Sequence, residues 1–187
     1  MSTVVFLDRD GVINQDSPHY VRHPDAFHFI PGSRQAIALL TRHGFDIILI
    51  TNQSVIGRKM VTPRTLELIF DKLRQGIDAA GGRILDIFFC PHTPDAGCDC
   101  RKPLPGLIFQ ARDRYDIDLS RSLMVGDSAT DILAARSAGC GTAVLVATGN
   151  GRQAFQTLTA QGMLPDHYAE DLLAAARWII TDKKALP

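Results

Sequence analysis

Residues 4–12 read Val4-Val5-Phe6-Leu7-Asp8-Arg9-Asp10-Gly11-Val12 and join a short apolar run to two carboxylates and a glycine. The continuous apolar run predicts a buried strand, and Gly11 allows the chain to turn sharply after it. Side chains alternate along an extended chain, so Asp8 and Asp10 can face the same side while Arg9 points away. The two carboxylates are therefore either a turn or helix cap, or a nucleophile beside an acid/base or metal-binding group.

Apolar runs and helical patterns alternate along the rest of the chain. Further strands are predicted at 45–51, 85–89, 122–125 and 142–146, and helices at 33–43, from Thr62 to the glycines at 81–82, from near Pro105, at 128–138 and at 168–179. This alternation predicts an α/β fold, a Rossmann-like three-layer domain with a mostly parallel sheet between helices. Residues 149–166 interrupt the pattern and receive no element. At 187 residues, we expect one domain over 1–187 without a large cap.

Composition excludes several classes of protein. Apolar residues make up 45% of the chain, which argues against disorder, and 20 basic residues balance 20 acidic ones. The neutral net charge gives no global attraction to nucleic acid or to anionic membranes. No uncharged apolar stretch approaches the roughly 20 residues of a membrane span, and residues 1–3 show no signal-peptide pattern. We therefore expect a cytoplasmic protein, and a monomer because no cap is available for assembly.

Polar motifs follow the first four predicted strands. They are Asp8-Arg9-Asp10, Thr51-Asn52-Gln53-Ser54, Cys90 with Arg101-Lys102-Pro103 beyond a short loop, and Gly126-Asp127 with Asp131 four residues later. Ligands of open parallel sheets bind beyond the carboxyl ends of the strands. Taken singly, Thr51 could form a turn, Asp127 could cap a helix and Lys102 could be a solvated charge. Their joint occurrence at corresponding positions favours a functional site.

These side chains suit phosphoryl transfer, which needs an in-line nucleophile and dense charge compensation. Asp8 would attack the phosphorus, and Asp8 with Asp127 would offer hard oxygen ligands to Mg²⁺. Asp10 would protonate the leaving alcohol and then activate water. The candidate contacts of the transferred phosphate are Thr51, Asn52 and Lys102.

The motifs Asp-x-Asp-Gly, Thr-Asn, a downstream Lys and Gly-Asp-x-x-x-Asp, in this order, resemble the haloacid-dehalogenase superfamily of phosphohydrolases. The resemblance implies that Asp8 forms an aspartyl phosphate and that Asp10 is the acid/base. It also implies a Mg²⁺ site made by Asp8, Asp127 and the main-chain carbonyl of Asp10. Asp131 would support this site from outside the set of metal ligands.

Three of the four cysteines fall within eleven residues and, with a histidine, form the pattern Cys90-Pro91-His92, five residues, Cys98-Asp99-Cys100. Four N/S ligands suit a tetrahedral structural zinc, which would make residues 90–100 a zinc loop. The alternatives are ordinary thiols or a disulfide, which a reducing compartment disfavours. Because Arg101 and Lys102 follow directly, the loop would also position them. Cys140 is expected to be a small buried apolar residue.

The zinc pattern followed by Arg-Lys-Pro resembles a small, capless branch that contains heptose 1,7-bisphosphate phosphatases and histidinol-phosphate phosphatases. Similarity to the heptose enzymes extends over residues 8–14, 51–58 and 100–106. It implies a sugar bisphosphate that loses its 7-phosphate, while the other phosphate must be held by positive charge. Arg58 and Arg101 are the candidates, since arginine suits bidentate phosphate recognition. The alternative for Arg58, with Lys59, is a solvated end of a loop.

Three other functions remain as alternatives. The five-residue zinc spacer also resembles histidinol-phosphate phosphatases, although Arg58 and Lys59 do not suit a substrate with amino and imidazole groups. A phosphatase for the 3′ ends of nucleic acids would need a path for a polyanion, and no basic-aromatic stripe is evident. A zinc-binding interaction module would leave Asp8, Asp10, Lys102 and Asp127 unexplained. We therefore expect a small-molecule substrate and neither nucleic acid nor membrane as a partner.

Overall fold

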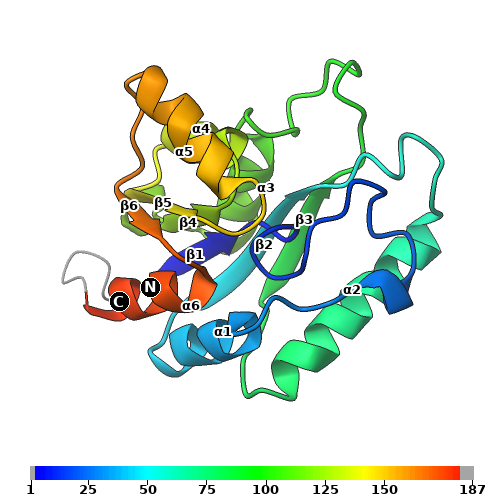
Figure 1. The fold of residues 1–187 in the computed structure, drawn as a ribbon, viewed down its shortest axis with the longest axis horizontal. Helices are drawn as coiled ribbons and strands as arrows, with labels where there is room; N and C mark the ends of the chain where they lie inside the picture. The colour runs from blue at the N-terminus through cyan, green and yellow to red at the C-terminus, as the bar shows by residue number, and fades with distance from the viewer. Residues whose placement is uncertain (1–2, 182–187) are drawn as a thin grey trace.

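The computed structural model describes residues 3–181, which form an α/β domain around one six-stranded sheet (Figure 1). The strands are β1 (Val4–Leu7), β2 (Asp46–Asn52), β3 (Asp86–Cys90), β4 (Leu123–Gly126), β5 (Thr142–Val146) and β6 (His167–Ala169). They lie in the order β3-β2-β1-β4-β5-β6, and every neighbouring pair is parallel. The order reverses at β1, where open parallel sheets form their binding crevice.

Six helices cover the two faces of the sheet (Figure 1). They are α1 (Ser33–Arg42), α2 (Pro63–Asp78), α3 (Gly106–Tyr115), α4 (Ala129–Ala138), α5 (Gly151–Ala160) and α6 (Leu172–Thr181), with short 3-10 turns at Pro24–Ala26 and Leu119–Arg121. Helices α1, α2 and α6 pack on one face and α3, α4 and α5 on the other. Helix α2 is capped by Thr62, whose hydroxyl oxygen accepts a hydrogen bond from the main-chain N–H of Thr65 at 3.1 Å.

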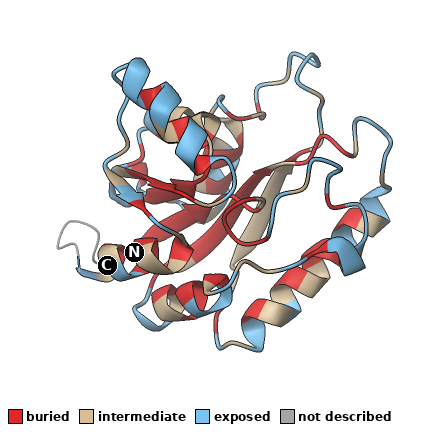
Figure 2. Ribbon diagram, viewed as in Figure 1, coloured by how far each residue is buried: buried red, intermediate tan, exposed pale blue. Residues whose placement is uncertain are grey.

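Strand β1 shows how the two layers of core arise from one sequence. Val5 and Leu7 belong to the cluster under α1, α2 and α6, while Val4 and Phe6 belong to the cluster under α3 and α4. All four side chains are buried, and the inner strands of the sheet are buried over most of their length (Figure 2). A strand covered on both faces needs apolar residues at every position, which explains the unbroken apolar run.

The first five predicted strands and the three-layer architecture are confirmed, and the sheet is wholly parallel. The final predicted helix at 168–179 is wrong at its start, because Tyr168 and Ala169 belong to β6 and α6 begins at Leu172. The unassigned stretch contains α5, and β6 has only three residues, one of them the exposed Tyr168. Such a short edge strand carries no alternating pattern. None of the helices within residues 3–181 has the length and apolar character that crossing a lipid bilayer requires.

Candidate active site

The carboxyl end of β1 brings Asp8 to the centre of the rim formed by the strand ends. The Asp8 main-chain N–H donates to Val125 of β4 at 3.0 Å, which holds this position between the two strands. Its carboxylate is buried, and Oδ1 lies 2.8 Å from the Lys102 ammonium. Burial raises the pKa of Asp8 to about 6, although Lys102 opposes the rise.

Lys102 is buried in the loop before α3 and balances two carboxylates at once. Its Nζ lies 2.8 Å from Asp8 and 2.5 Å from Asp131, and it donates to the Ile50 carbonyl at 2.7 Å. Burial alone would lower the pKa of Lys102, but the charges of Asp131 and Asp8 outweigh it and raise that pKa above its ordinary value. Lys102 is therefore a charged group in the interior of the protein. The alternative interpretation of Lys102 as a solvated surface charge is wrong.

Three buried carboxylates, from Asp8, Asp127 and Asp131, each place an oxygen within 4.8 Å of the others. One ammonium cannot neutralise three carboxylates, and burial together with the charges of Asp8 and Asp131 raises the pKa of Asp127 to about 8. A hard cation would relieve this excess negative charge, so the donor set fits Mg²⁺. Asp131 already uses Oδ1 for Lys102 and Oδ2 for the main chain and hydroxyl of Ser128. This leaves Asp8 and Asp127 as the side chains best placed to bind the ion.

The side chain of Asp10 binds a different set of side chains from the three carboxylates around Lys102. Arg9, expected to point away, turns its buried guanidinium back so that Nη2 lies 2.6 Å from both Asp10 oxygens. Asn14 and Gln53 add hydrogen bonds at 2.9 and 3.1 Å. Burial would raise the pKa of Asp10, but Arg9 and these donors lower it below its ordinary value. Asp10 is thus held as a carboxylate, the form that can take a proton from water.

The expectation for Arg9 was wrong because the alternation of side chains ends with the strand. Strand β1 stops at Leu7, and the next residues form a turn in which the Arg9 carbonyl accepts hydrogen bonds from the main chains of Ile13 and Asn14. Asn14 and Gln53 stand inside motifs that resemble the phosphohydrolases, so their positions could be singled out. Their contact with Asp10 could not, because it depends on how the two loops fold over one another.

Thr51 and Asn52 end β2 beside the same carboxylates, as their place in the motif predicts. Thr51 is buried, and its hydroxyl accepts a hydrogen bond from Gln53 at 2.9 Å. Asn52 pairs with the main chain of Lys102: its Oδ1 accepts from the N–H at 3.1 Å and its Nδ2 donates to the carbonyl at 3.2 Å. Asn52 therefore also fixes the loop that carries Lys102.

These carboxylates line a cavity of about 320 Å³, together with side chains from the loops described above. Its lining includes Asp8, Asp10, Thr51, Asn52, Lys102 and Asp127, and also Tyr20, Arg58, Arg101 and Asn150. A second hollow of about 420 Å³ adjoins it and shares Asn52, Arg101 and Lys102. The structure thus brings both predicted phosphate-binding arginines to the cavity that contains Asp8.

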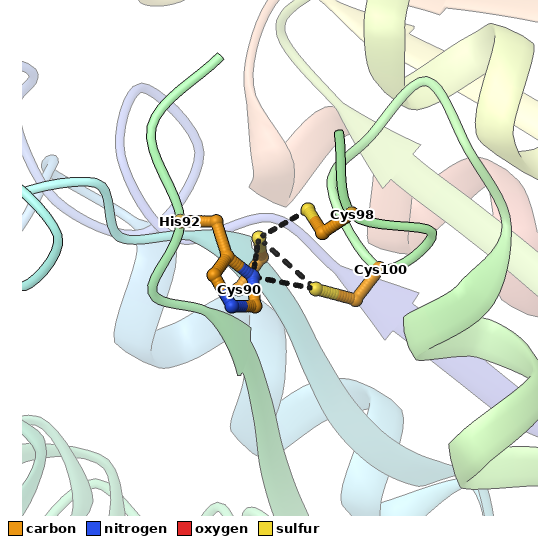
Figure 3. A group of neighbouring side chains, drawn as sticks. All are labelled: Cys90, His92, Cys98 and Cys100. Carbon is orange, nitrogen blue, oxygen red and sulfur yellow. Dashed lines mark hydrogen bonds between the residues drawn. The ribbon is translucent and has the colours of Figure 1, made fainter. Parts of the chain in front are cut away.

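The predicted zinc ligands converge at the end of β3 (Figure 3). The Cys90 sulfur lies 3.6 Å from Nδ1 of His92, 3.6 Å from the Cys98 sulfur and 3.1 Å from the Cys100 sulfur, and His92 Nδ1 lies 3.3 Å from Cys100. A tetrahedral zinc with bonds of about 2.0–2.3 Å separates its donors by roughly 3.3–3.8 Å. Three of the four distances lie within this range, and the Cys90–Cys100 distance is slightly shorter, so the four side chains can hold such an ion after a small adjustment. All four cysteines of the chain are free of disulfides.

The thiols of this cluster differ in acidity. Burial raises the pKa values of Cys90 and Cys100 above the ordinary thiol value. For Cys98, desolvation opposes ionisation, but hydrogen bonds from the main chain of Arg101 and from the neighbouring thiols bring the pKa down to about 7. Cys98 is therefore the first of the three to form the thiolate that binds a metal.

Hydrogen bonds join the zinc loop to Arg101 and to the loop that follows β2. Arg101 Nη1 donates to the His92 carbonyl at 3.2 Å. The main-chain N–H of Gly57 donates to Pro91 at 2.8 Å, and that of Gln53 donates to Cys90 at 2.7 Å. A β-carbon at Gly57 would come within 2.7 Å of the Pro91 carbonyl, so the two loops lie in direct contact. The loop that carries Arg58 is thus packed against the zinc loop.

Comparisons with known proteins agree with this geometry. Residues 99–175 match the HAD-hydrolase-like family model. The D-glycero-beta-D-manno-heptose-1,7-bisphosphate 7-phosphatase of Bordetella bronchiseptica is 46% identical over 96% of this chain and 98% of its own length. The protein of the same name from Pseudomonas aeruginosa is 42% identical over 93% of this chain and 96% of its own. The crystal structure of the B. bronchiseptica phosphatase, complexed with magnesium and phosphate, superposes with a TM-score of 0.88 and covers 95% of this chain and 98% of that one.

Proposed function

The chain belongs to the family of D-glycero-D-manno-heptose-1,7-bisphosphate 7-phosphatases, and we infer that it hydrolyses the 7-phosphate ester of such a bisphosphate. The products would be the heptose 1-phosphate and inorganic phosphate. The observation that carries the proposal is the buried group in which Lys102 joins Asp8 to Asp131 beside Asp127, because a nucleophile, a fixed positive charge and a cation site meet there.

We propose that the reaction proceeds in two steps on Asp8. In the first, the Asp8 carboxylate attacks phosphorus, the bond between phosphorus and the ester oxygen on carbon 7 breaks, and that oxygen takes a proton from Asp10. In the second, Asp10 takes a proton from water, which attacks the aspartyl phosphate and returns the Asp8 carboxylate. The Arg9, Asn14 and Gln53 contacts favour the carboxylate form that the second step needs, so Asp10 must acquire its proton as substrate enters.

Mg²⁺ would be held by Asp8, Asp127 and the Asp10 main-chain carbonyl, and when bound it neutralises charge on the phosphoryl oxygens. The donor chemistry of the carboxylate group supports this assignment. Zn²⁺ would be held by Cys90, His92, Cys98 and Cys100, which leave no open position for catalysis. Its role would be structural, because the cysteine loop supports the segments that carry Arg58 and Arg101.

Arg58 and Arg101 are proposed to bind the phosphate that is not hydrolysed. Both line the cavity, and neither takes part in the Lys102 group. Thr51 and Asn52, at the end of β2, and Lys102 are proposed to contact the transferred phosphate. We further propose that the protein works as a monomer in the cytoplasm, where reducing conditions would preserve the free cysteines.

The decisive experiment compares kcat/KM for heptose 1,7-bisphosphate and for histidinol phosphate in the presence of Mg²⁺. We expect a clear preference for the bisphosphate, with phosphorus NMR showing that the 1-phosphate survives. Asp8→Asn serves as the mechanistic control, because the amide keeps the shape but cannot form the aspartyl phosphate. Preference for histidinol phosphate would overturn the substrate, and normal turnover by Asp8→Asn would overturn the covalent mechanism.

A further inference from the structure

The Asp127 carboxylate lies between two glycine turns that come from different strands. Gly11 follows β1 and Gly149 follows β5, and a β-carbon on either residue would overlap the Oδ2 atom of Asp127. The two glycines also touch, since a β-carbon on Gly149 would lie 2.7 Å from the Gly11 Cα. Both have positive φ angles, 79° for Gly11 and 57° for Gly149. Only residues without a side chain allow this close approach.

Polar contacts hold the second turn in place. The main-chain N–H of Asn150 donates to Asp127 Oδ2 at 2.8 Å, and the Asn150 side chain reaches the same oxygen at 3.5 Å and Asp16 at 3.3 Å. The Thr148 hydroxyl donates to the Gly11 carbonyl at 2.6 Å and so ties the two turns together. Among residues 3–181, the hydrogen bonds to the Asp127 carboxylate all use Oδ2.

We propose that residues Thr148–Asn150 form a positioning turn for Asp127. The turn fixes the carboxylate through Oδ2 and leaves Oδ1 to bind the divalent cation. The inference rests on the proposed function in assigning Asp127 to the metal. It goes further by giving Thr148, Gly149 and Asn150 a role, although they lie in a stretch where the sequence predicts no element.

The burial of Asp127 explains why its carboxylate needs a fixed partner. Asp127 is 3% exposed and sits beside two other carboxylates, so its ionised form is costly without a fixed partner. The Asn150 N–H supplies that partner, and the packed glycines prevent the carboxylate from rotating away. Groups that orient a metal ligand without touching the ion typically account for about 10- to 100-fold in metal affinity.

The test is Mg²⁺ binding by calorimetry in the absence of substrate, on the full chain with its zinc content checked. Gly149→Ala should weaken Mg²⁺ affinity at least about tenfold, since the new methyl group must displace the Asp127 carboxylate. The matched control is Gly162→Ala, which has a similar φ of 67° but finds nothing within 4 Å of its new β-carbon. It imposes comparable backbone strain and should leave Mg²⁺ affinity within about twofold of wild type.

Thr148→Val provides a milder test that does not depend on folding of the alanine variant. It keeps the side-chain shape, removes the hydrogen bond to Gly11, and should lower Mg²⁺ affinity about fivefold, the fold-change that one hydrogen bond is typically worth. Unchanged affinity in Gly149→Ala, equal losses in both glycine variants, or unchanged affinity in Thr148→Val would each overturn the proposal. If the variants behave as expected but the wild type hydrolyses no phosphate ester, the positioning role stands and the proposed function fails.

Discussion

Replacing Lys102 with methionine removes the cation that joins Asp8 to Asp131. Among residues 3–181, no other basic side chain lies within ion-pair distance of either carboxylate. Methionine keeps the length and apolar stem of the buried lysine, so the change is mainly one of charge. Two buried carboxylates, with Asp127 beside them, then face one another without compensation.

The loss of stability follows from the cost of an unpaired buried charge. Breaking a buried ion pair by removing one partner costs about 3–5 kcal/mol. We expect a loss of that size in Mg²⁺-free buffer at neutral pH, measured by urea unfolding without a chelator so that the cysteine cluster is left undisturbed. We also expect kcat to fall roughly 100- to 1,000-fold at saturating Mg²⁺, because a fixed positive charge beside the nucleophile is lost.

A double-mutant cycle separates the two effects. Adding Asp131→Asn to Lys102→Met removes one of the unpaired charges, so the double variant should regain about 2 kcal/mol of the lost stability. Its kcat should stay low, because the charge beside Asp8 is still missing. If kcat returns together with stability, Lys102 serves the fold and not the reaction. If Lys102→Met unfolds at the wild-type urea concentration, the description of Lys102 as the balancing charge is wrong.

Three further predictions follow from the same geometry. Arg58→Ala should lower kcat/KM about ten- to 100-fold for the sugar bisphosphate, because a charge-assisted contact is worth about 1.5–3 kcal/mol. The loss for p-nitrophenyl phosphate should be much smaller. Equal losses on both substrates would mean that Arg58 serves the fold or the chemistry in general. Wild-type protein should contain about one zinc per chain by inductively coupled plasma analysis, and Cys98→Ser should reduce zinc content, stability and activity together; zinc-free but fully active protein would exclude the structural zinc. In Mg²⁺-free buffer, stability should fall by up to about 1.4 kcal/mol per pH unit between pH 6 and 8, because the raised pKa of Asp127, about 8, means that the folded state binds a proton which the unfolded state has released. Mg²⁺ should abolish this fall, and a flat or rising urea midpoint over that range would contradict it.

The residues that could be placed from the sequence are those whose position depends on strand ends. In a parallel sheet every carboxyl end lies at one edge, so Asp8, Thr51, Cys90 and Asp127 must meet there whatever the details of the loops. The metal-binding pattern of the cysteine loop was equally local, since its four donors fall within residues 90–100. The structure brings Asp8, Thr51 and Asp127 to one cavity, and it brings Cys90 together with the other three donors of the zinc loop.

The contacts that could not be placed depend on how loops pack against one another. Arg9 turns back to Asp10 because the strand ends two residues earlier, and Gln53 reaches Asp10 across 43 positions of sequence. The sequence predicts no element for the turn at 148–150. Its role depends on the contact between Gly149 and the Asp127 carboxylate, and such a contact leaves no periodic pattern in the sequence. In these cases the decisive partner is distant in the chain, so neither propensity nor spacing identifies it.

The distribution of positive charge supports the proposed metal requirement. The Lys102 ammonium is already bound to Asp8, Asp131 and the Ile50 carbonyl, and Arg9 is bound to Asp10. Both cations are already paired with carboxylates, so neither brings uncompensated positive charge to an incoming phosphate dianion. A phosphate placed beside Asp8 would therefore meet excess negative charge unless a divalent ion enters with it. Arg58 and Arg101 also line the cavity, and neither forms an ion pair with Asp8, Asp10 or Asp131, so they remain the proposed ligands of a second phosphate. This distribution of charge supports the proposal that a metal ion serves the phosphate that reacts and that arginine binds the one that stays.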